Sequence, residues 1–240
     1  PVGFWQIQNL ELLVKLKSVY AMSKGRYGSP RISIELRADG VNASRPRIAR
    51  LMKINGIKSI MKRKYRLTTN SNHLYPVNAN LLSRDFSTTG TGEKWVSDIT
   101  YIRTGEGWLY LTMVMDLADR KIIGWSMENS MSANSTVVEA WKMAIKNRPL
   151  ERELIFHSDR GIQYASHEFR RCFKGLPVLQ SMSRKGNCWD NAIAERAQAK
   201  LEIFDYIEVW YNRKRRHSAL DYMTPVQMEK IMMKNKTEAA

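Results

Sequence analysis

Three consecutive runs of β-favouring residues between positions 95 and 127 constrain the fold of this chain most strongly. The runs span residues 95–102, 108–116 and 121–127, and β-branched and aromatic side chains are frequent in them. Only short turns separate the runs, and strands joined by short turns pair in antiparallel order. We therefore expect an antiparallel meander of three strands.

Helices and strands alternate after this meander. A helix is expected to begin near Ser132 or Asn134, because apolar residues recur at helical spacing up to Ile145. A short apolar strand over residues 154–156, a helix over 167–173 and a last strand over 178–182 follow. This order predicts an α/β fold with a mixed five-stranded sheet flanked by helices, over a domain of residues 93–212.

The first 66 residues predict a small all-α region. Residues 10–22 and 31–38 have helical periodicity, and a third helix should begin after Ser44 and stop at Asn55 and Gly56. This is a helix-turn-helix pattern. Its third helix carries four basic residues, which we expect to contact DNA: Arg45, Arg47, Arg50 and Lys53. The simpler interpretation is a helical domain with a solvated basic face.

The charge of the chain favours a nucleic-acid partner. Its 39 Lys and Arg residues against 23 Asp and Glu give a formal net charge of +16, and no acidic residue occurs between Asp39 and Asp85. Such an excess indicates a polyanion, either nucleic acid or an anionic membrane surface. No apolar stretch is long enough to span a membrane, and no signal peptide is evident. We therefore expect double-stranded DNA as the partner and a cytoplasmic location.

Two further segments complete the expected domain organisation. Residues 67–92 are rich in Thr, Asn and Ser without periodicity, so we expect a linker. Residues 213–240 are expected to form a basic C-terminal tail, in which Arg213, Arg215 and Arg216 bind phosphates. The two cysteines provide no disulfide framework and no usual zinc spacing. The chain begins with Pro1, so we expect it to start within a longer product.

Three carboxylates form the candidate catalytic site. Asp98 lies within the first strand, Asp159 follows the strand at 154–156, and Glu195 lies in the first turns of a helix capped by Asp190 or Asn191. Carboxylates are the ligands that Mg²⁺ prefers, and two such ions can serve an in-line phosphoryl transfer. Taken singly, Asp98 would more often be a solvent-face residue, Asp159 a turn former and Glu195 a solvated helix residue.

Several neighbours are weaker candidates for the same site. Lys185 and Asn191 are expected to touch the DNA backbone, with solvation and helix capping as alternatives. His157 could position a phosphate or a water, or simply pack. Asp116 and Asp190 are rival acids that fit a strand end and a helix cap better.

The chain resembles the transposases of the bacterial insertion sequence three family. The residues that carry the resemblance are WVSDITYI, LYLTMVMDLADRKIIGW, IFHSDRGIQYAS, QSMSRKGNCWDNAIAE and YIEVWYNRKRRHSALDYMTP, with RYGSPRISIELR and ARLMKINGI nearer the start. The resemblance implies a ribonuclease-H-like core similar to retroviral integrase. It also implies an Asp98, Asp159 and Glu195 triad holding two Mg²⁺ or Mn²⁺ ions, nicking at element ends, attack by the freed 3′-hydroxyl, and a homo-oligomer on DNA.

The resemblance changes after Glu195. In the family, a lysine-bearing helix and a loop precede the helix similar to IFDYIEVWYN, whereas here residues 196–202 join directly to Ile203. We therefore expect an internal deletion, with residues 192–212 able to form one helix. The alternative to an active transposase is a catalytically impaired DNA-binding remnant. A third hypothesis, a ribonuclease H for RNA–DNA hybrids, leaves the helix-turn-helix pattern unexplained.

Overall fold

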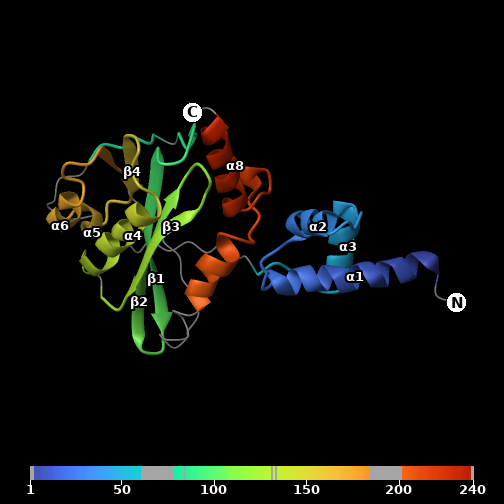
Figure 1. Ribbon diagram of the computed structural model, residues 1–240. Coiled ribbons are helices and arrows are strands. Elements are labelled where there is room, and N and C mark those ends of the chain that lie inside the picture. Colours follow the sequence, from blue (N-terminus) through green and yellow to red (C-terminus); the bar gives the residue numbers. More distant parts are fainter. Residues whose placement is uncertain are drawn as a thin grey trace. The chain divides into compact units, whose positions relative to one another are not determined.

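The chain divides into two compact units in this computed structural model (Figure 1). Residues 3–60, 78–83, 85–130, 132, 134–183 and 202–238 are described by the structure. One unit contains residues 1–63 together with 215–222, and the other contains residues 64–214 together with 223–240. We call them the helical unit and the core unit, and we describe each separately.

The core unit contains the expected five-stranded mixed sheet. Its strands are β1 (Lys94–Thr104), β2 (Gly107–Asp116), β3 (Ile122–Glu128), β4 (Leu154–Ser158) and β5 (Val178–Met182). They lie in the order β3-β2-β1-β4-β5. The meander β1, β2 and β3 is antiparallel, whereas β4 pairs parallel with both β1 and β5. The α/β fold predicted from the sequence is confirmed.

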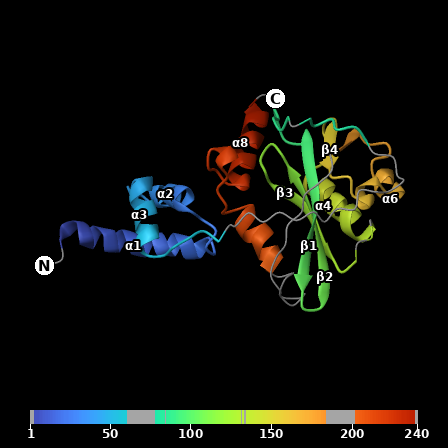
Figure 2. The ribbon, with the colours of Figure 1, turned by 180° about the vertical axis from the view of Figure 1, so that it is seen from behind.

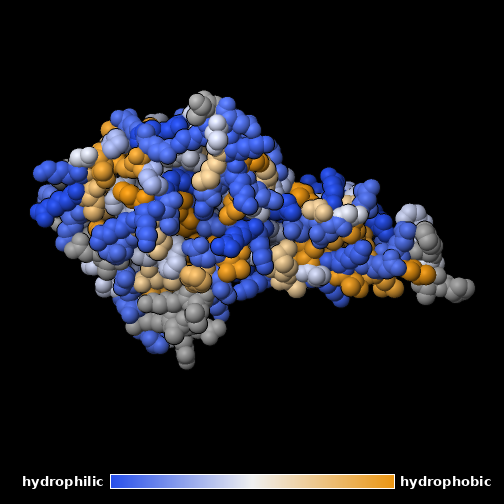
Figure 3. Space-filling model, in the orientation of Figure 1, coloured by the Kyte–Doolittle hydropathy of each residue, from blue (hydrophilic) through white to orange (hydrophobic). Residues whose placement is uncertain are grey.

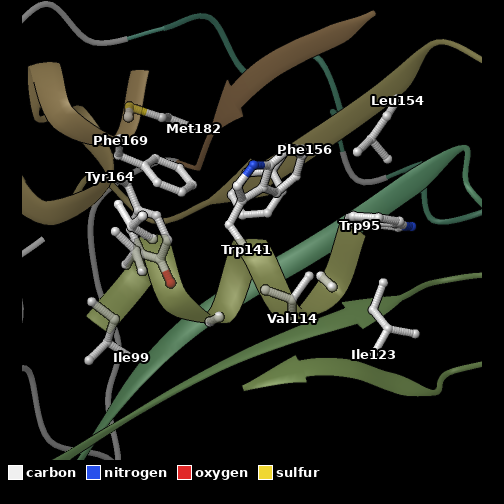
Figure 4. Packing of buried hydrophobic residues seen from close by; sticks show 14 of the residues in the cluster. Trp95, Ile99, Val114, Ile123, Trp141, Leu154, Phe156, Tyr164, Phe169 and Met182 are labelled. Carbon is white, nitrogen blue, oxygen red and sulfur yellow. The ribbon is translucent and has the colours of Figure 1, made fainter. Parts of the chain in front are cut away.

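One face of the sheet carries the main hydrophobic core. A π-helical turn at Asn134–Val138 leads into α4 (Glu139–Asn147), and α5 (Ile162–Ala165) and α6 (His167–Arg171) follow β4. The Trp141 ring lies 5.3 Å from the Phe156 ring and 5.7 Å from the Trp95 ring, centroid to centroid (Figure 4). Gly124 lets α4 approach β3, because a Cβ there would lie 2.2 Å from the carbonyl oxygen of Ala140.

The other face of the sheet receives residues 202–212, whose helix includes the π-helical segment Asp205–Tyr211 (orange in Figure 2). Trp125 donates a hydrogen bond of 2.8 Å from its indole nitrogen to Glu208, and its ring contacts Phe204. The side chain of Asn212 bonds both the amide nitrogen and the carbonyl oxygen of Ile122. These contacts attach residues 202–212 to β3.

The chain ends in a helix that the sequence analysis did not assign, α8 (Pro225–Glu238). Thr224 and Gln227 cap its start reciprocally, since the amide of each bonds to the side chain of the other at 2.9 and 3.3 Å. Glu229 then pairs with Lys121 and Arg148 at 2.7 and 2.8 Å. Arg148 also pairs with the buried Asp116 and Asp119, so α8 is attached to the core unit by an ion network.

The helical unit consists of α1 (Phe4–Met22), α2 (Ser29–Ala38) and α3 (Arg45–Ile54) around a small apolar core. Ser44 caps α3 by accepting a hydrogen bond from the amide of Arg47. Apolar side chains also remain at the surface of α1, notably Leu10 and Val14 (Figure 3). None of the helices in the described ranges combines the length and apolar character that a membrane crossing requires.

Residues 215–222 complete the helical unit although they lie between two segments of the core unit in sequence. Arg216 forms an ion pair with Glu35 on α2, and its amide donates a 3.1 Å hydrogen bond to the hydroxyl of Tyr27. Arg31 donates from Nε to the carbonyl oxygen of Arg216 at 3.2 Å. We refer to residues 215–222 as the return segment.

Candidate active site

Asp98 lies on β1, and Asp159 directly follows the neighbouring strand β4. The parallel pairing of β1 with β4 aligns Val96 with His157, so each aspartate follows the last aligned pair by two residues. Adjacent strands lie about 4.8 Å apart. The fold therefore brings together two of the three predicted catalytic acids, 61 residues apart in sequence, where the pairing of β1 with β4 stops.

Asp98 lies on the face of the sheet opposite the main core. Trp95, Ser97 and Ile99 are buried on the core side, and side chains alternate along a strand, so Asp98 points to the other side. Asp159 comes after β4, where the chain turns towards α5. Asp98 thus lies within β1, and Asp159 follows the last residue of β4, beyond the point where the pairing of these two strands stops.

Gly161 orients the Asp159 carboxylate, and the sequence analysis did not single it out. Its amide donates a 2.8 Å hydrogen bond to Oδ1 of Asp159. A Cβ at Gly161 would lie 2.9 Å from that same oxygen, closer than real Cβ contacts allow. The signal in the sequence is the glycine two residues after the aspartate, a spacing that permits a tight turn around the carboxylate.

The electrostatic environment of Asp98 favours a cation. Its side chain is exposed on one side, yet the surrounding protein removes much of its solvation. This burial, together with repulsion from the Asp159 carboxylate, raises the pKa of Asp98 to about 7. A divalent cation between the two groups would remove the repulsion, and carboxylate oxygens are its preferred ligands.

His157 is held by hydrogen bonding beside the two aspartates. Its Nδ1 lies 2.8 Å from Oγ of Ser181 on β5, and the amide of Leu81 donates to that hydroxyl at 2.9 Å. Burial lowers the pKa of His157, which favours the neutral imidazole at neutral pH. The side chain thus links β4 to β5 and to residues 81–82.

Of the other acids considered for the site, two lie outside the described residues and one has a structural position. Glu195 and Asp190, with the predicted DNA contacts Lys185 and Asn191, lie outside the described residues. Within the described ranges, no cluster of three Asp, Glu, His or Cys side chains suited to a metal ion is present. Asp116 is buried and bound by Arg148 and by the indole nitrogen of Trp95 at 2.9 Å, which gives it a structural position.

The basic residues of α3 are not equivalent. Arg45, Arg50 and Lys53 are exposed, as a surface that contacts DNA requires. Arg47 instead packs against α1. Its guanidinium lies 5.6 Å from the Trp5 ring centroid, and its Nε donates a 2.9 Å hydrogen bond to Oδ1 of Asn9. Arg47 therefore positions α3 against α1 in addition to any contact with DNA.

The three arginines expected to bind phosphate near the C-terminus also differ. Arg213 is exposed, and Arg215 is half-buried. Arg216 is engaged with Glu35 and donates a further hydrogen bond of 3.3 Å to the carbonyl oxygen of Tyr222. Its guanidinium serves the fold of the helical unit, a role that the sequence analysis did not anticipate because Glu35 lies 181 residues away.

Family models and known proteins match both units. An HTH-like domain matches residues 8–65, and integrase core domain models match residues 88–188 and 185–232. Transposase InsF for insertion sequence IS3A of Escherichia coli (strain K12) is 39% identical over 230 residues, covering 88% of this chain and 80% of that protein. The 31 kDa protein of insertion element IS600 of Shigella sonnei is 38% identical over 232 residues, covering 89% of this chain and 85% of that protein.

The matches cover different fractions of the proteins compared. The alignment with the IS3A transposase is 230 residues long, although it covers only 88% of the 240 residues of this chain. Some residues of that transposase therefore align with gaps in this chain. Among solved structures, the HTLV-2 integrase catalytic core domain in complex with magnesium gives a TM-score of 0.43 at 13% identity, covering 60% of this chain and 99% of that one.

The sequence relatives span both units and most of their own length. The chain belongs to the insertion sequence three (IS3) family of transposases, and it carries an integrase core domain preceded by an HTH-like domain.

Proposed function

We propose that this transposase cleaves DNA at the ends of an insertion sequence and joins the freed 3′-hydroxyl to a phosphodiester of target DNA. One observation carries the proposal: Asp98 on β1 and Asp159 just after β4 each lie two residues beyond the last aligned pair of these neighbouring strands. Two carboxylates that repel each other fit a site for Mg²⁺ or Mn²⁺. Glu195 is the proposed third ligand.

The chemistry follows from what these residues can hold. When bound, two such ions would lower the pKa of the attacking water or 3′-hydroxyl and stabilise the departing oxygen. Asp98 and Asp159 supply the ligand oxygens, and Gly161 fixes the direction of one of them. Strand transfer needs two ends in one complex, so we propose a homo-oligomer on double-stranded DNA, acting in the cytoplasm.

DNA binding is assigned to two groups of basic residues. The exposed side chains of Arg45, Arg50 and Lys53 on α3 would enter or flank a groove, as the second helix of a helix-turn-helix does. Arg213, Arg215, Lys185 and Asn191 are proposed to contact phosphates of the DNA backbone. Arg47 and Arg216 are proposed to contribute mainly by holding the helical unit together.

Nicking of DNA tests the proposal. The substrate is a labelled duplex that carries the terminal sequence of the chain's own insertion sequence, with Mn²⁺ added. We expect nicking by the unchanged chain, loss of at least about 100-fold in Asp159→Asn, and little change in Glu153→Gln, which alters an exposed carboxylate just before β4. Specific binding without nicking by the unchanged chain would instead favour a DNA-binding remnant.

A further inference from the structure

The backbone pairing between β1 and β4 stops before it reaches the two aspartates. The aligned pairs run from Lys94 with Ile155 to Val96 with His157. Asp98 and Asp159 each lie two residues further along, where β4 has ended. Like charges repel at this point, so the separation of the two carboxylates needs another restraint.

A buried side-chain hydrogen bond spans this end of the strands. The Oγ of Ser97 lies 2.7 Å from the hydroxyl of Tyr164, and both residues are buried. Ser97 directly precedes Asp98 on β1. Tyr164 lies on α5, and its amide donates a 3.0 Å hydrogen bond to the carbonyl oxygen of Gly161, the residue whose own amide bonds Asp159.

Tyr164 is itself firmly held in the core unit. Its carbonyl oxygen accepts a 2.7 Å hydrogen bond from Nε2 of Gln180, and the side-chain oxygen of Gln180 accepts one from Asn78. The ring packs with centroids 5.7 Å from Phe169 and 6.4 Å from Phe156, as the close view of the core shows (Figure 4). Because the ring is held on several sides, its hydroxyl can hold Ser97 in a defined position.

We propose that the Ser97–Tyr164 hydrogen bond is a positioning device that sets the separation of the Asp98 and Asp159 carboxylates for a divalent cation. The hydrogen bond lies on the core side of the sheet. It restrains Asp98 through the adjacent residue Ser97, and it restrains Asp159 through Gly161, which binds both Tyr164 and the Asp159 carboxylate. Ser97 and Tyr164 are both buried, and we assign them a positioning role that acts through the two aspartates. The inference rests on the proposed function, because it presupposes that the aspartates hold a metal ion.

The test measures Mn²⁺ binding to the full chain by electron paramagnetic resonance, without DNA and without turnover. Tyr164→Phe keeps the ring and removes the hydroxyl, and Ser97→Ala removes the other partner. We expect each variant to raise the apparent Kd for Mn²⁺ about three- to tenfold, the range that one hydrogen bond supports. The double variant should bind no more weakly than either single variant.

Two controls separate positioning from general loss of structure. Tyr20→Phe removes a hydroxyl that also makes a 2.7 Å hydrogen bond, to the carbonyl oxygen of Lys58 in the helical unit, and should leave Mn²⁺ affinity unchanged. Thermal unfolding of every variant establishes that binding is measured on folded protein. A merely structural bond would lower Tm and leave the Kd for Mn²⁺ as it was.

The outcomes are distinguishable. If the unchanged chain binds Mn²⁺ and the Kd of each single variant is within twofold of the unchanged chain's value, the positioning role is wrong while the proposed function stands. Additive effects of the two substitutions would also overturn the coupling. If the unchanged chain and Asp159→Asn show the same lack of Mn²⁺ binding, the proposed metal site fails, and this inference fails with it.

Discussion

At the scale of single residues, the site depends on small groups that hold two like charges near each other. The Asp159 carboxylate receives the amide of Gly161, and Asp98 lies in a setting that disfavours its ionised form. A residue that supplies only a backbone amide is easily overlooked beside the acid it serves. Here the absence of a side chain at Gly161 also matters, because a Cβ at this position would lie only 2.9 Å from Oδ1 of Asp159.

Replacement of Gly161 by alanine should therefore displace the Asp159 carboxylate without disrupting the fold. A Cβ 2.9 Å from Oδ1 would force the carboxylate to move by several tenths of an ångström. Since a shift of about 1 Å can reduce a rate on the order of 100-fold, we expect Mn²⁺-dependent nicking to fall about tenfold or more in Gly161→Ala. Gly105→Ala is the matched control, because a Cβ at Gly105 meets nothing within 4 Å. Equal nicking by the two variants would show that the Gly161 contact has no catalytic consequence.

At the scale of elements, an ion network joins α8 to the rest of the core unit. Glu229 pairs with Lys121 and Arg148, and Arg148 in turn lies between the buried Asp116 and Asp119. Removal of one member of a buried ionic network is destabilising, because the remaining charges lose a partner in a setting where water does not replace it. The position of α8 should therefore depend on the ionisation of Glu229.

Glu229→Gln should lower the free energy of unfolding by about 1–2 kcal/mol at pH 7. Burial opposes ionisation of Glu229, but hydrogen bonds and charges from Lys121 and Arg148 outweigh it and lower the pKa of Glu229 below its usual value of 4.5. A lowered folded pKa gives stabilisation that is present above 4.5 and lost as the pH falls through the folded value. Urea unfolding at a series of pH values should show the difference between the two proteins shrinking below pH 4.5. Glu238→Gln, an exposed acid on the same helix, should change stability little at any pH.

The elements also show what sequence patterns can and cannot predict. The strands β1, β2 and β3 were predictable because alternation and short turns are local features, and the strand before Asp159 was predictable from its apolar run. The return segment was not, because the pairing of Arg216 with Glu35 depends on residues far apart in the chain. The α8 helix had a local signal in Thr224, Pro225 and Gln227, but its basic composition favoured a solvated tail.

The candidate site was predictable to a similar degree. Asp98 and Asp159 could be selected from their places at strand positions, although only the β1 to β4 register aligns them. Sequence patterns do not reveal the support from Gly161 and Tyr164, because that support consists of a backbone amide and a buried hydroxyl in three-dimensional contact. Arg47 was grouped with its exposed neighbours by charge alone, whereas its contact with Trp5 depends on how α1 and α3 pack.

At the scale of the whole molecule, the positive charge is spread over both units while the carboxylate site belongs to one of them. The net charge of +16 favours association with DNA of any sequence through counterion release. Exposed Arg45 and Arg50 belong to the helical unit, and Asp98 and Asp159 belong to the core unit. If binding and chemistry are divided in this way, a change on α3 should weaken DNA binding and leave the metal site intact.

The double variant Arg45→Gln, Arg50→Gln tests this division. We expect weaker binding to element-end DNA, measured by fluorescence anisotropy at several salt concentrations, and a slope of log K against log salt that is smaller in magnitude by about two, because each lost phosphate contact contributes about 0.9. The Kd for Mn²⁺ without DNA should stay unchanged. Lys230→Gln, Lys234→Gln is the matched control, because it removes two exposed charges from α8. An equal loss of slope in both double variants would mean that DNA binding follows total charge, and that α3 has no special part in it.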